Sequence, residues 1–194
     1  MKRVLFVLLL SVCALAACEK PVSFHSVDVT GIQGYGNDFR LTDHTGKARS
    51  MADFRGKTVL MFFGFAQCPD VCPTALTRAV EAKRALGNDG QRLQVIFVTV
   101  DPERDTRELL AEYVPAFDPR FIGLYADLPT TQAVAKDFKV FYQKQGDVKG
   151  TAYTVDHSTG TYVFDPQGRL RLYVKHGEKP DLIAADIRKL IAGQ

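Results

Sequence analysis

Two long apolar segments, separated by an amphipathic one, give the first indication of the fold. Residues 58–65 (TVLMFFGF) and 93–100 (LQVIFVTV) are almost continuously apolar, which is typical of strands buried on both faces of a sheet. Between them, residues 73–86 start with a proline, carry an apolar stripe at helical spacing and are followed by Gly87. Strand, helix and strand in this order predict a βαβ unit with two parallel strands.

The rest of the pattern adds elements to this unit. A strand is expected near Leu41, and helices with capping or proline signals are expected to start at Asp105, Pro129 and Pro180. Further strands are predicted at 152–155, 161–164 and 170–174, the last two joined by a tight turn as an antiparallel hairpin. The pattern therefore predicts one α/β domain with a mixed central sheet and helices on both faces.

The N-terminus has a different composition. Residues 1–17 carry two cations, an apolar stretch and then small residues, which is the layout of a secretory signal peptide. The stretch is too short for a comfortable membrane span, although a plain anchor helix is an alternative. The ending Leu15-Ala16-Ala17-Cys18 resembles a bacterial lipobox, so we expect lipidation at Cys18 and a bacterial cell-envelope location outside the cytoplasm.

Residues 18–37 are polar and glycine-rich, and we expect a lipidated N-terminus followed by a flexible tether, with the folded domain at 38–194. The net charge is +3, and without the two cations of the signal the balance is 23 basic against 22 acidic residues. No basic block or aromatic-basic stripe is present in the sequence, which argues against nucleic-acid binding.

The candidate chemistry lies in a short stretch, FGFAQCPDVCP, directly after the first apolar segment. Of the four cysteines, Cys13 would leave with the signal and Cys18 would carry acyl chains, so Cys68 and Cys72 remain as thiols. They lie between the carboxyl end of a predicted strand and the start of a predicted helix, where the helix dipole should favour thiolate. A structural disulfide, a redox pair and a metal site all remain open, and three intervening residues distinguish the pair from a thioredoxin-type motif.

Two thiolates are an incomplete ligand set, so a metal site requires another ligand. Of the four histidines, His157 ends a predicted strand that can reach the cysteine loop, although a lone histidine at a strand end also fits a structural role. Soft thiolate ligands suit Cu(I), and zinc less exclusively.

Three segments in this order, GFAQCPDVCPTAL, VTVDPERDT and VDHSTGTYVFDPQG, resemble the Sco/SenC family from about Phe39 to the C-terminus. The resemblance implies a thioredoxin-like fold and copper, as Cu(I) or Cu(II), bound by Cys68, Cys72 and His157. It also implies delivery of copper to the copper-binding subunit of cytochrome c oxidase, with another periplasmic copper chaperone as a further partner. The family's usual Tyr-Thr-His before the first cysteine is replaced here by Phe65-Ala66-Gln67, which affects neighbouring positions and not the three ligands.

Other functions share the same residues. A thiol–disulfide oxidoreductase that keeps the client's cysteines reduced would use Cys68 and Cys72 as its redox pair, so enzymatic activity stays open. A peroxiredoxin-like peroxidase fits poorly, because Phe65 stands where that chemistry needs a threonine.

Four carboxylates near the predicted site also have two interpretations. Asp70 either adjusts the charge of the site or is a solvated turn residue. Asp156 either orients His157 or has a structural role, and strand alternation favours the latter. Asp101 is expected to stabilise a turn, and Asp105 to cap a helix.

Overall fold

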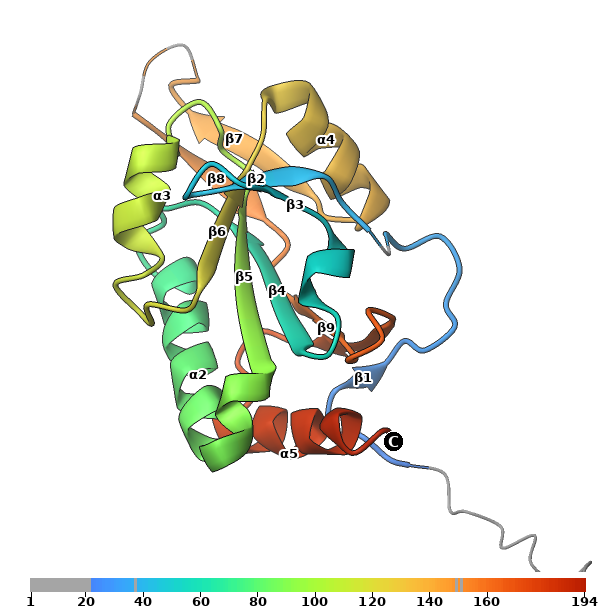
Figure 1. Cartoon of the computed structure of the whole chain (residues 1–194). Coiled ribbons are helices and arrows are strands. Elements are labelled where there is room, and N and C mark those ends of the chain that lie inside the picture. The colour runs from blue at the N-terminus through green and yellow to red at the C-terminus, as the bar shows by residue number, and fades with distance from the viewer. Residues whose placement is uncertain (1–21, 37, 149, 151) are drawn as a thin grey trace, which may run out of the picture.

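The computed structural model describes residues 22–36, 38–148, 150 and 152–194. Within these residues an eight-stranded sheet runs in the order β1-β10-β9-β4-β5-β6-β2-β3 (Figure 1). Its strands are β1 (Val27–Asp28), β2 (Leu41–Asp43), β3 (Ala48–Arg49), β4 (Thr58–Gly64), β5 (Leu93–Thr99), β6 (Ile122–Tyr125), β9 (Thr161–Phe164) and β10 (Leu170–Val174). A separate two-stranded sheet consists of β7 (Tyr142–Gly146) and β8 (Tyr153–His157).

The two apolar segments form the centre of the large sheet. β4 and β5 pair in parallel from Thr58↔Leu93 to Gly64↔Thr99, and every residue of both strands is buried. β9 pairs antiparallel with the other edge of β4, and β9 and β10 form the predicted hairpin. The mixed sheet is thus confirmed, because β4 has a parallel neighbour on one edge and an antiparallel neighbour on the other. Burial on both faces explains why these strands are largely apolar.

Helices cover both faces, as predicted. They are α2 (Val71–Ala85), α3 (Arg107–Tyr113), α4 (Leu128–Asp137) and α5 (Pro180–Ile191), with 3-10 turns at Met51–Phe54 and Gly87–Arg92. Leu60 of β4 lines a small hollow together with Ala79 of α2 and Ile183 of α5. On the opposite face the ring of Phe63 lies 5.3 Å from that of Phe138, the residue that caps α4.

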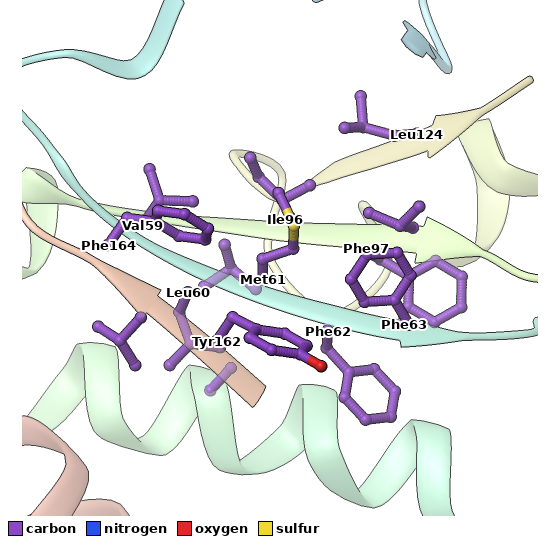
Figure 2. Close-up of a cluster of buried hydrophobic side chains, with 14 of the residues drawn as sticks. Val59, Leu60, Met61, Phe62, Phe63, Ile96, Phe97, Leu124, Tyr162 and Phe164 are labelled. Carbon is purple, nitrogen blue, oxygen red and sulfur yellow. The ribbon is translucent and has the colours of Figure 1, made fainter. Parts of the chain in front are cut away.

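Alternation along β4 therefore determines which side chains reach the side of the sheet that α2 covers. Figure 2 shows Leu60 and Phe62 on the side of β4 that faces helix α2. Phe62, Phe63 and Phe65 are each at most 2% exposed, so the aromatic cluster is core, as the sequence indicated.

The tether predicted at 18–37 is wrong from His25 onward. β1 pairs antiparallel with β10, the N–H groups of His25 and Ser26 both donate to the Asp186 carboxylate of α5, and Val29 is buried. This segment is held to the domain by hydrogen bonds of its backbone groups, which do not require apolar side chains. The sequence therefore shows no apolar pattern here. The folded unit thus begins well before residue 38.

The predicted signal peptide, Cys13 and Cys18 lie outside the described residues. None of the helices in the described ranges is long and apolar enough to cross a bilayer.

Candidate metal centre

The structure brings together the two cysteines and the histidine that the sequence singled out. Cys68 lies in the loop after β4, Cys72 in the first turn of α2, and His157 at the last position of β8. One donor atom from each lies within 4.8 Å of the other two, and Cys72 Sγ is 3.4 Å from His157 Nε2. Two segments that are 85 residues apart in sequence thus converge on one point.

Cys72 is the inner sulfur. It is 0% exposed and packs over Gly64, where an added Cβ would lie 2.7 Å from Sγ. Burial raises the pKa of the Cys72 thiol well above its usual range. This direction is opposite to the thiolate-favouring effect expected of the helix N-terminus, because the loss of water around the sulfur disfavours its charged form.

Cys68 is the outer sulfur. It is half-buried and accepts the backbone N–H of Cys72 at 3.4 Å, while its own N–H donates to the carbonyl of Phe65 at 3.2 Å. The two cysteines are not joined by a disulfide. An open hollow beside Cys68 is lined by Pro69, Asp156 and other residues of the cysteine loop and β8. A reacting group from outside therefore meets Cys68 first.

The imidazole of His157 is oriented by a backbone carbonyl. Nδ1 lies 2.8 Å from the carbonyl oxygen of Ser158, which can only accept, so Nδ1 carries the proton and Nε2 keeps a lone pair facing Cys72. The rings of Phe62 and Phe65 meet the imidazole edge-on at 5.8 and 5.9 Å. Burial lowers the pKa of His157, which favours the neutral form that a metal requires.

The exposed carboxylates near the site make few contacts. Asp156 is exposed on the opposite face of β8 from Val155, and the orienting partner of His157 is Ser158 instead. Asp70 is exposed at the N-cap position of α2, where its carboxylate accepts the Thr74 hydroxyl at 3.4 Å. Neither contacts the imidazole by a hydrogen bond that the structure records among the described residues.

The buried carboxylates have larger roles than predicted. Asp105 does not cap α3; Thr106 does, accepting the N–H of Leu109. The Asp105 carboxylate instead accepts the N–H of Ala66 at 2.9 Å and the hydroxyl of Thr99 at 2.6 Å, which ties the cysteine loop to β5. Burial raises the pKa of Asp105 to about 6. Asp101 is buried after β5, where it does stabilise a turn.

The sequence analysis did not identify Gly64 as part of the site. A glycine at the end of an otherwise bulky apolar strand indicates that another group approaches the backbone closely, and here that group is Cys72 Sγ. Ser158 was also not identified, because its contribution is a backbone carbonyl and leaves no trace in residue type.

Comparison with known proteins gives consistent matches over the domain. The family SCO1/SenC matches residues 28–192. The human mitochondrial SCO2 homolog is 38% identical over 157 residues, covering 80% of this chain and 59% of the human protein. A SCO2-like protein of Rickettsia felis is 39% identical over 142 residues, covering 73% and 68%. This chain thus spans about three fifths of the length of its mammalian relatives.

Solved structures agree with the sequence relatives. Bradyrhizobium japonicum ScoI, solved with copper bound, has a TM-score of 0.73 at 38% identity, covering 80% of this chain and 99% of that one. Apo Sco1 of Thermus thermophilus has a TM-score of 0.75 at 37% identity, covering 89% and 99%. The predicted thioredoxin-like α/β fold is confirmed, and the chain belongs to the SCO1/SenC family.

Proposed function

We propose that this protein is a copper metallochaperone that binds one copper ion through Cys68, Cys72 and His157. The observation that carries the proposal is the convergence of two sulfurs and one imidazole nitrogen within 4.8 Å. Two thiolates and a neutral imidazole form a three-coordinate set suited to Cu(I), and a further oxygen or nitrogen ligand would complete a Cu(II) site. The copper bound by the similar Bradyrhizobium japonicum protein supports the choice of metal.

The unequal burial of the ligands suits transfer of the ion. Cys68 is half-buried while Cys72 is fully buried, so an incoming thiol can replace the Cys68 sulfur before it displaces the inner ligands. We propose the copper-binding subunit of cytochrome c oxidase as the client and another periplasmic copper chaperone as the donor. A lipid on Cys18 would hold the domain at the outer side of a bacterial membrane, and replacement of Cys18 by alanine should then release the protein from membranes.

A competition titration tests the copper site. The protein beginning at residue 22, which contains every strand of the sheet, is reduced and titrated without oxygen against a Cu(I) chelator. We expect about one equivalent to bind with loss of affinity in C68S, C72S and H157A. H176A is the matched control, because His176 is exposed and outside the ligand cluster. Failure of the unsubstituted protein to compete at micromolar concentration would refute the proposal.

A second function, thiol–disulfide oxidoreduction, is favoured by the arrangement of the two sulfurs. The Cys72 N–H donates to the sulfur of Cys68, and Cys68 is the more accessible cysteine, so it is the one placed to attack a client. Attack by Cys68 on a client disulfide would release one client thiol and form a mixed disulfide, and Cys72 would then release the second client thiol and leave Cys68 and Cys72 oxidised. H157A distinguishes the two roles, because it should weaken copper binding and leave disulfide reduction intact.

A further inference from the structure

The hairpin that carries His157 has few backbone connections to the rest of the domain. β7 and β8 pair with each other from Tyr142↔His157 to Gly146↔Tyr153, and no described strand of the large sheet pairs with either. His157 is followed after three residues by Thr161, the first residue of β9. At the end that carries His157, the hairpin is joined to β9 on one strand and to α4 on the other. The opposite end of β8, at Tyr153, has to be held by other contacts.

Side chains from the loop after β5 hold that end. The Tyr153 hydroxyl donates to Asp101 Oδ1 at 2.7 Å, and Arg104 Nε donates to Asp101 Oδ2 at 2.5 Å. Arg104 Nη1 donates in turn to the backbone carbonyl of Tyr153 at 2.7 Å. All three side chains are at least nine-tenths buried, so these charge-assisted bonds are shielded from water.

The same arginine also reaches the cysteine loop. Its guanidinium lies 3.6 Å from the centre of the Tyr153 ring and 5.8 Å from that of Phe65. Phe65 in turn contacts the imidazole of His157 edge-on at 5.9 Å. A second link joins β7 to the loop after β5, through an ion pair between Lys144 and Glu103.

We propose that Asp101, Arg104 and Tyr153 form a latch that positions His157 by fastening the β7–β8 hairpin to the cysteine side of the domain. None of the three contacts the site donors by a recorded bond, so they are positioning residues. Without the latch the hairpin is restrained mainly by its short connections to α4 and β9, and the imidazole samples positions away from the sulfurs. The role in copper binding rests on the proposed function, whereas the fastening of the hairpin does not.

Hydrogen exchange in the metal-free protein tests the fastening. Y153F removes the hydroxyl that reaches Asp101 and keeps the ring. Y162F is the comparison variant, because Tyr162 is also buried and its hydroxyl donates to the carbonyl of Phe138 at 2.6 Å, outside strands β7 and β8 and without contact to Asp101. We expect amides of residues 142–146 and 153–157 to exchange roughly 10- to 100-fold faster in Y153F, as for loss of a hydrogen bond to a charged group. Hairpin exchange in Y153F as slow as in the unsubstituted protein would overturn the latch.

A double-mutant cycle with copper tests whether the latch acts through His157. We expect Y153F to lower Cu(I) affinity about tenfold in the otherwise unchanged protein and to have no further effect in H157A, because the positioned ligand is then absent. An equal loss in both backgrounds would overturn the positioning role. Absence of copper binding by the unsubstituted protein would refute the proposed function instead, and hydrogen exchange alone would then decide whether the latch exists.

Discussion

Gly64 is not a ligand, but we expect its replacement to disturb the site because Cys72 packs directly against it. Gly64 ends β4 beneath the inner sulfur, and replacing it with alanine adds one methyl group. That Cβ would lie 2.7 Å from Cys72 Sγ, 2.8 Å from the Phe62 ring and 3.0 Å from the Phe97 ring. Ordinary contacts of a Cβ are 3.4–4 Å, so all three neighbours must shift, and the sulfur is one of them.

The cost follows from the packing. Inserting a methyl group into a filled core costs about 1–3 kcal/mol. Alanine also restricts the unfolded chain, which returns about 0.4–1 kcal/mol. We therefore expect G64A to lower the free energy of unfolding by about 1–2 kcal/mol and the Tm by about 2–8 °C. Because Cys72 Sγ must move, Cu(I) affinity should fall about tenfold as well.

Thermal unfolding of the metal-free protein and a Cu(I) competition titration measure the two effects. G123A is the matched control: Gly123 is also a strand glycine, and its added Cβ would meet a Val114 methyl group at 3.1 Å, away from the cysteines. That variant should lose a similar or smaller part of its stability and keep its copper affinity. A G64A protein with unchanged Tm and unchanged affinity would refute the packing of Cys72 against Gly64.

Three further predictions test other parts of the molecule. Since burial raises the folded-state pKa of Asp105 to about 6, its contribution favours the folded state at low pH, and about 2 kcal/mol is lost as pH rises from 4 to 7. D105N should remove this dependence in urea titrations, and identical pH profiles of the two proteins would contradict it. D186A should make residues 22–30 accessible to limited proteolysis and lower the free energy of unfolding by about 2–3 kcal/mol, because two backbone N–H groups lose a charged acceptor. An unchanged cleavage pattern would argue against the docked N-terminal segment. In the native metal-free protein, iodoacetamide should modify Cys68 before Cys72, and peptide mass spectrometry measures the order. The reverse order would contradict the burial of Cys72.

The sequence was sufficient for the parts of the fold that depend on local pattern. The segments at 58–65 and 93–100 became the central parallel pair because only an apolar strand can be covered on both faces. The positions of Cys68 and Cys72 followed from the strand before them and the helix after them. Their convergence with His157 came from the family resemblance, since spacing alone favoured a structural role for the histidine.

The parts that sequence reasoning missed are held by tertiary contacts. β1 and β7 are polar and short, so their own sequences show no strand pattern. β1 forms by pairing with β10, which is distant in sequence, and β7 forms by pairing with β8, which follows it after a turn. Asp105 fits a helix cap in sequence, but burial turns it toward the cysteine loop while Thr106 caps the helix. Local rules describe what a residue can do, and packing decides which option it takes.

X-ray absorption of the Cu(I)-loaded protein tests the central claim most directly, because it identifies the atoms bound to copper. We predict two sulfur donors and one imidazole nitrogen in the unsubstituted protein, and loss of the imidazole signal in H157A with both sulfurs retained. A spectrum that H157A leaves unchanged would contradict the site built from Cys68, Cys72 and His157.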